Sequence, residues 1–136
     1  MLLEWNQNLS VNIAEIDEQH QKLVGMLNDL HDATHSGKSK EILASLINGL
    51  ANYAAIHFKT EEIFMKRYRF PGLKAHCIEH KEFVKKADEY REQFEMEMNP
   101  LILAMAILTF LKEWLQNHIL KTDKQYGPFL NEKGIS

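Results

Sequence analysis

The stretch from Leu43 to Phe64, LASLINGLANYAAIHFKTEEIF, is the part of the chain that decides the fold. Its large side chains recur at alternating spacings of three and four residues, which places them on one face of an α-helix. The members of this seam are Leu43, Leu46, Leu50, Tyr53, His57, Glu61 and Phe64. His57 and Glu61 therefore occupy positions where the pattern requires an apolar side chain. A buried ionised carboxylate is costly without a positive partner, so the stretch predicts a packed helix that carries a metal.

The same alternation recurs in three other segments, and each of them also carries histidine. These seams are Ile13-Ile16-His20-Leu23-Leu27-Leu30, Leu73-His76-His80-Phe83-Ala87-Tyr90-Phe94 and Leu101-Ala104-Leu108-Leu111-Leu115-His118. Residues typical of helix termini lie near their ends: Asp17, Ser39, Pro71 and Asn99-Pro100 at starts, and Gly37 at an end. The sequence therefore predicts helices over residues 17–36, 40–67, 71–97 and 100–120.

The short connections between these helices require neighbouring helices to run antiparallel. The predicted fold is therefore all-α, an up-down-up-down antiparallel four-helix bundle. In that arrangement the starts of the first and third helices share one end of the bundle with the finishes of the second and fourth. At ~1.5 Å of rise per residue, the candidate ligands on the helices then fall in one half of the bundle. They are His20, His57, Glu61, His76, His80 and His118.

A chain of 136 residues suits one domain with a core of useful size. We expect that single domain, residues 1–136, to comprise an N-terminal arm over 1–16, a bundle over 17–120 and a C-terminal tail over 121–136. The arm carries the apolar residues Trp5, Leu9 and Val11 but lacks the paired start and end signals of a helix. It is therefore predicted to pack in an extended form across the bundle.

Asp123 is a candidate ligand that regular helix geometry would turn away from the others. It follows His118 by five residues, which rotates it about 140° around a regular α-helix. It joins the cluster only if the backbone loosens there, through a π-type turn or a fraying helix end. The residues Lys121-Thr122-Asp123, with Gly127-Pro128 beyond them, predict that the fourth helix ends in this region.

Bulk properties exclude several classes of function. The net charge is only −3 and no basic stripe is present, which argues against nucleic-acid binding. The apolar run from Leu101 to Leu111 is too short to span a bilayer. The chain opens without a signal segment, and its single cysteine, Cys77, excludes an intramolecular disulfide. These features together predict a cytoplasmic protein.

Five imidazoles and two carboxylates exceed what one metal ion can use, whereas two ions that share both carboxylates as bridges would use all seven. Zinc usually takes four ligands and favours thiolate in structural sites, and calcium and magnesium prefer oxygen. Imidazole with some carboxylate suits iron, copper or nickel, and iron is common in bridged pairs. Sites that cleave dioxygen usually carry more carboxylates, so this nitrogen-rich set favours binding O2 over activating it.

Other residues near the seams have plainer interpretations. His31 is interpreted as a core or helix-end histidine. His35 is interpreted as a side chain whose positive charge, when protonated, is favourable at a helix C-terminus. Cys77 lies off the ligand face, which predicts packing, and Glu62 is expected to turn about 100° from Glu61 towards the helix flank. Tyr53 has two interpretations, core packing or a hydrogen bond just outside the ligand set.

The chain resembles the hemerythrins, in their single-domain bacterial form, along nearly its whole length. The matching elements are Trp5 in the arm, Ile16-Asp17-Glu18-Gln19-His20, the HxxxE at 57–61, the HxxxH at 76–80, Trp114-Leu115 before the HxxxxD at 118–123, and Tyr126. The four motifs occur in the family's order and no ligand position is missing.

The resemblance implies a role for each candidate residue. His76, His80 and His118 would hold one non-heme iron, and His20 and His57 would hold the other. Glu61 and Asp123 would bridge the two irons beside an oxo or hydroxo group. The two-histidine iron would keep an open position for O2, in a pocket lined by Trp114, Leu115 and Ile119.

The implied function is reversible dioxygen binding by a protein that is not an enzyme. Such a protein, expected to be a monomer, would store or transport O2 or deliver it to an O2-consuming enzyme. Two alternatives remain open at this point: a diiron peroxidase or oxidase that uses the bound oxygen, and an iron store or sensor.

Overall fold

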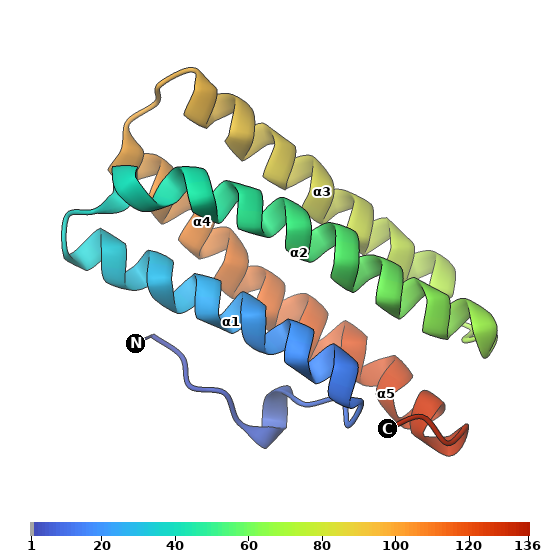
Figure 1. Ribbon diagram of the computed structural model, residues 1–136. Coiled ribbons are helices and arrows are strands. Elements are labelled where there is room, and N and C mark those ends of the chain that lie inside the picture. Colours follow the sequence, from blue (N-terminus) through green and yellow to red (C-terminus); the bar gives the residue numbers. More distant parts are fainter. Residues whose placement is uncertain (1) are drawn as a thin grey trace.

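Four long helices run alternately up and down in a computed structural model that describes residues 2–136 (Figure 1). They are α1 (Ala14–His35), α2 (Ser39–Arg67), α3 (Leu73–Glu95) and α4 (Pro100–Trp114). Their connections span only residues 36–38, 68–72 and 96–99, so successive helices are antiparallel. The predicted all-α, up-down-up-down bundle is confirmed. None of the helices formed by the described residues is long and apolar enough to cross a membrane.

Two of the predicted helix termini have the expected capping chemistry. The Asn99 side chain accepts a hydrogen bond from the Ile102 backbone N–H (3.1 Å), and Pro100 occupies the first helical position of α4. Gly37 adopts a positive φ of 72° after α1, and the Lys38 N–H donates to the Ala33 carbonyl (2.8 Å). This bond closes the helix end with a left-handed residue that favours glycine.

Two other helices start two or three residues from the positions predicted. Helix α1 begins at Ala14, three residues before Asp17, whose carboxylate instead accepts a hydrogen bond from the Val11 N–H (2.9 Å) and so holds the end of the arm. Helix α3 begins at Leu73 rather than at Pro71, because the turn before it runs through Arg69 at a φ of +56°.

The predicted end of the fourth helix near residue 120 is also wrong. Helix α4 continues directly into a π-helical segment, η2 (Leu115–Asp123), and then into α5 (Lys124–Glu132). Tyr126 and Leu130 of α5 are fully buried, and burying such side chains contributes ~1.5–3 kcal/mol each, which offsets the one backbone bond lost at Pro128. The segment 121–136, predicted as the C-terminal tail, is therefore mostly helical.

The N-terminal arm crosses the bundle in the predicted extended form, interrupted by one short 3-10 turn, η1 (Gln7–Leu9). Figure 1 shows it running alongside α1. The Asn28 side chain of α1 holds its beginning, accepting from the Leu3 N–H (2.8 Å) and donating to the Leu3 carbonyl (2.7 Å). Leu9 and Val11 are buried further along.

The apolar core forms two clusters along the bundle axis. The larger one fills the middle and the far half, with Leu23, Leu27, Leu30, Leu43, Leu50, Phe83, Leu103, Ile107 and Leu111 among its members. The smaller one closes the other end with Val11, Ile13, Ile16, Met65, Tyr126 and Leu130. The sequence positions of the candidate ligands lie between these two sets, so the polar layer is enclosed by apolar side chains on both sides.

Candidate metal centre

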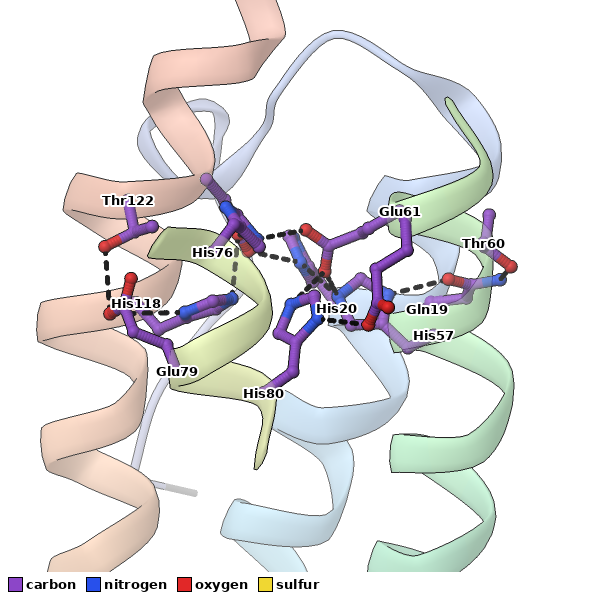
Figure 2. Close-up of polar contacts among 12 residues, drawn as sticks. Gln19, His20, His57, Thr60, Glu61, His76, Glu79, His80, His118 and Thr122 are labelled. Atoms are coloured by element: carbon purple, nitrogen blue, oxygen red, sulfur yellow. Dashed lines mark hydrogen bonds and ion pairs between the residues drawn. The ribbon is translucent and has the colours of Figure 1, made fainter. Parts of the chain in front are cut away.

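The structure brings all seven predicted ligands together in one layer. Figure 2 labels the five histidines and Glu61 of this layer. Helix α1 supplies His20, α2 supplies His57 and Glu61, α3 supplies His76 and His80, and η2 supplies His118 and Asp123. None of the seven is more than 3% exposed to solvent. Their ligand atoms fall into two groups, each within 4.8 Å internally: Glu61 with His76, His80 and His118, and Glu61 with His20, His57 and Asp123.

The Nε2 atoms of the imidazoles point inward at the two carboxylates. His76 Nε2 lies 2.9 Å from Glu61 Oε2 and 2.9 Å from Asp123 Oδ1. The distances to Asp123 are 2.9 Å from His118 Nε2 and 3.0 Å from His20 Nε2. His57 Nε2 contacts both Glu61 Oε1 and His20 Nε2, the latter at 2.9 Å. Each carboxylate thus has imidazoles from more than one helix around it.

A π-type turn places Asp123 in this layer, as the predicted loosening of the backbone requires. A turn that closes after five residues returns Asp123 to the face of His118, which a regular helix would not do. The Thr122 hydroxyl stabilises the widened turn by donating to the Asn117 carbonyl, five residues earlier (3.1 Å). The loosened helix is therefore confirmed, and its cause includes a side chain that the pattern analysis overlooked.

Two imidazoles are hydrogen-bonded from outside the layer through their other nitrogen, and a third faces a carboxylate there. His57 Nδ1 donates to Gln19 Oε1 (2.6 Å) and His80 Nδ1 donates to Glu62 Oε2 (2.8 Å), while His118 Nδ1 faces Glu79 Oε1 at 3.5 Å. A hydrogen on Nδ1 leaves the Nε2 lone pair free to point inward, which is the tautomer that a metal ligand needs. Gln19 is fixed in turn, because its amide donates to Thr60 Oγ1 (3.2 Å).

Sequence reasoning missed these outer partners. Glu62, expected on the helix flank, reaches back to His80 across the α2–α3 interface. All three partners directly flank a ligand in the chain: Gln19 precedes His20, Glu62 follows Glu61, and Glu79 precedes His80. The available signal was the position of each partner next to a seam ligand in the sequence. That position does not predict which histidine of another helix the partner will bind.

The donor set fits a pair of cations. Several buried atoms find no hydrogen-bond partner among the described residues: His80 Nε2, His118 Nε2, Glu61 Oε1 and both carboxylate oxygens of Asp123. Inward lone pairs on nitrogen face anionic oxygens, which is unfavourable unless positive charge lies between them. Imidazole with a minority of carboxylate is the donor chemistry that suits iron, so the residues fit that metal.

Protons and metal ions compete for these ligands. Burial opposes the charge on His76, but the Asp123 and Glu61 carboxylates beside it outweigh burial and raise its pKa to about 10. Burial and the Asp123 carboxylate would raise the pKa of Glu61, yet His57 and His76 lower it to about 2. His118, His20 and His76 likewise lower the pKa of Asp123 well below its usual value, against the effect of burial. A metal ion bound here at neutral pH would therefore have to displace protons.

Aromatic and aliphatic side chains cover the core side of the layer. Trp114 stacks on the His118 ring (centroids 4.0 Å apart, planes at 14°), and Leu115 and Ile119 are buried beside it in the larger cluster. Phe58, which the sequence analysis did not single out, stacks on His80 (4.0 Å, 7°). The three predicted pocket residues therefore share the apolar side of the cluster, together with Phe58.

The other residues singled out in the sequence lie outside the two groups of candidate ligand atoms. His31 and His35 pair with each other near the end of α1, with ring centroids 4.2 Å apart. The thiol of Cys77 is free and only partly buried. Tyr53, in contrast, stacks on the His57 ring (4.9 Å, 17°) and is buried.

Comparisons with known proteins agree on one family. The family model described as the hemerythrin HHE cation binding domain matches residues 11–130. The bacteriohemerythrin of Methylococcus capsulatus is 33% identical over 134 residues, covering 96% of this chain and 98% of that protein. The bacteriohemerythrin of Stenotrophomonas maltophilia is 34% identical over 126 residues, covering 93% and 80%. A crystal structure of wild-type hemerythrin superposes with a TM-score of 0.79 at 30% identity, covering 94% of this chain and 97% of that one.

Proposed function

Because this chain belongs to the hemerythrin family of non-heme iron-binding domains, we propose that its seven buried ligands hold two bridged iron ions and bind dioxygen reversibly. One observation carries the proposal. Imidazole Nε2 lone pairs from four helical segments are directed at two carboxylates in a layer that excludes solvent. Such an array is costly as a purely structural feature, and metal ions would make it favourable.

The proposed ligand roles follow the two groups that share Glu61. His76, His80 and His118 would hold one iron, and His20 and His57 the other. Glu61 would bridge, because its two oxygens face imidazoles of both groups. Asp123 would be the second bridge, since His118 and His20 approach different oxygens of its carboxylate.

The iron pair would supply a reversible exchange of two electrons with dioxygen. The protein's own residues would limit side reactions of that exchange. Trp114, Leu115 and Ile119 would exclude water from the position left open beside the two-histidine iron. Gln19 and Glu62 would hold imidazole rings in place through their Nδ1 atoms. Two carboxylates balance only two positive charges, which disfavours strongly oxidised states and therefore favours carriage over oxidation chemistry.

The physiological role that we propose is O2 storage, transport or delivery to an O2-consuming enzyme. The test is repeated deoxygenation and reoxygenation of the ferrous protein, with metal content measured beforehand. We expect about two irons per chain and an oxygenated spectrum that returns in each cycle. One zinc per chain without oxo-bridged iron absorption would contradict the metal assignment. Rapid conversion to diferric protein with peroxide consumption would instead identify an enzyme, and iron that a chelator removes easily would identify a store or sensor.

A further inference from the structure

Three buried donors border the ligand layer without a hydrogen-bond partner among residues 2–136: Tyr53 Oη, Trp114 Nε1 and Tyr126 Oη. A buried hydroxyl without a partner is unfavourable, and phenylalanine at the same position would avoid that cost. The two tyrosines lie on opposite sides of the layer. Tyr53 belongs to the larger apolar cluster with the proposed pocket residues, and Tyr126 belongs to the smaller cluster that closes the end of the bundle.

Tyr53 occupies a distinctive place on the pocket side. It lies one turn before His57 on α2, and its ring stacks on that imidazole. Burial raises the pKa of the Tyr53 hydroxyl well above its ordinary value, and the Glu61 and Asp123 carboxylates raise it further, while the Trp114 indole N–H opposes them. The Tyr53 ring centroid lies 5.8 Å from that of Phe83, and the Phe83 centroid lies 4.8 Å from that of Trp114. Tyr53 is therefore on the Trp114 side of the ligand layer. It remains protonated at neutral pH and can act as a donor.

We propose that Tyr53 Oη is the hydrogen-bond donor to a small ligand bound beside His57, at the open position of the two-histidine iron. This inference rests on the proposed function and adds a positioning residue to it. The ligand class is a small molecule that is anionic or becomes negatively charged when bound, such as dioxygen or azide. A donor in an apolar pocket stabilises such charge strongly, because no water competes for it. The Tyr53 O–H has no acceptor among residues 2–136, so it is available for this role without breaking an existing bond.

Tyr126 provides the matched control. Its hydroxyl is equally buried, and its pKa is raised by burial first and by the Glu61 and Asp123 carboxylates next. Its ring lies 5.4 Å from His76, a ligand assigned to the other iron. Tyr53→Phe and Tyr126→Phe therefore remove the same atom at the same depth on opposite sides of the layer. Neither change removes a metal ligand, so both variants should load iron like the parent.

The experiment titrates azide into the diferric forms of the parent and of both variants. We expect Tyr53→Phe to raise the Kd for azide by about 10- to 100-fold, as loss of a hydrogen bond to a charged group does, and Tyr126→Phe to leave it unchanged. The antisymmetric stretch of bound azide should shift in D2O for the parent and for Tyr126→Phe, but not for Tyr53→Phe. The apo form of Tyr53→Phe should unfold at no lower temperature than the parent, because its hydroxyl has no partner to lose.

Several outcomes would overturn the assignment. Equal azide affinity in the parent and Tyr53→Phe would do so, and so would a D2O shift that persists in Tyr53→Phe, which would point to Trp114 as the donor. The absence of any D2O shift in the parent would overturn it without reference to a variant. A parent protein that takes up no iron would instead contradict the proposed function, so the two failures are distinguishable.

Discussion

Individual side chains outside the candidate ligands orient the histidines of the candidate centre. Glu62 shows this best, because its neighbour Glu61 lies inside the layer while its own carboxylate binds His80 from outside. Adjacent residues on one helix thus contact the same layer, one from inside it and the other from outside. The same holds for Gln19 and His20, where the amide supports His57 and the imidazole faces Asp123.

Replacing these two glutamates should have different consequences. Glu61→Ala removes a proposed bridge and leaves cationic metal uncompensated, so iron content at saturation should fall to about half or less, and thermal stability of the loaded protein should fall with it. Glu62→Ala should keep full loading but weaken iron affinity by about 10–100-fold, as loss of an outer partner does. The measurements are iron stoichiometry and a competitive chelator titration, with the exposed Glu82→Ala as control. Equal stoichiometry in the two variants would refute the bridging role.

Ile119 tests the pocket assignment without touching a ligand. Trimming it to alanine should admit water beside the open position, so the oxygenated form should autoxidise faster while iron content stays near that of the parent. Ile119 is fully buried, so the change also costs about 2–5 kcal/mol of stability and the rates must be compared well below unfolding. Ile78→Ala, at a half-exposed site on α3, is the control. If both variants autoxidise at the parent's rate, Ile119 does not guard the site.

At the scale of elements, the joint between α4, η2 and α5 organises the ligand end of the molecule. The π-helical turn brings Asp123 into the layer, and α5 then seals the layer with Tyr126 and Leu130. The arm reaches the same end, where the Gly127 backbone approaches Val11 so closely that an added Cβ would lie 3.0 Å from the Val11 carbonyl oxygen. Glycine is therefore required there for contact between elements, not for an unusual φ.

Two glycine substitutions should consequently have opposite signs. Gly127→Ala should destabilise the apo protein by about 1–3 kcal/mol, because a backbone carbonyl cannot move aside as a flexible side chain can. Gly25→Ala, inside α1, should stabilise it by about 0.5–1 kcal/mol, because apart from the helix's own backbone no atom of residues 2–136 lies within 4 Å of the added Cβ. Urea unfolding of the apo forms measures both. A neutral Gly127→Ala would show that the arm does not pack tightly on α5.

At the scale of the whole molecule, a polar layer whose burial is energetically unfavourable is enclosed between two apolar clusters. The clusters supply the burial that stabilises the bundle, and the layer between them concentrates charge that the fold must neutralise. Without metal, the neutralising charges are protons shared between imidazoles and carboxylates. Stability of the apo bundle should therefore depend on pH in a defined direction on each side of its optimum.

The sign follows from the two pKa values. Glu61 shifts from 4.5 when unfolded to about 2 when folded, so its contribution is present above pH 4.5 and is lost as the pH falls towards 2. His76 shifts from 6.5 to about 10, so its contribution is complete below pH 6.5 and is lost as the pH rises towards 10. The apo protein should therefore be most stable between about pH 4.5 and 6.5. Thermal unfolding of the apo protein across pH 3–10 measures this, and a Tm that does not fall above pH 6.5 would contradict protonation of His76.

Much of the fold and of the candidate ligand cluster could be predicted from local spacing. A helix repeats every 3.6 residues wherever it lies, so the seams fixed both the faces that pack and the positions of His57 and Glu61 on them. The short connections then allowed only the antiparallel topology, which places the candidate ligands at the same height along the bundle axis. Even Asp123 entered the prediction, on the condition that the helix loosened, and η2 meets that condition.

Tertiary structure alone decided the features that depend on contacts between elements. The helix continues past Gly127 and Pro128 because Tyr126 and Leu130 find buried sites against the arm and α2, an energy that no local breaker signal contains. The partnerships of Gln19, Glu62 and Glu79 depend on side-chain conformations across helix interfaces, which helical periodicity does not specify. Sequence periodicity determines which residues face inward, whereas only the packed bundle determines which of them meet.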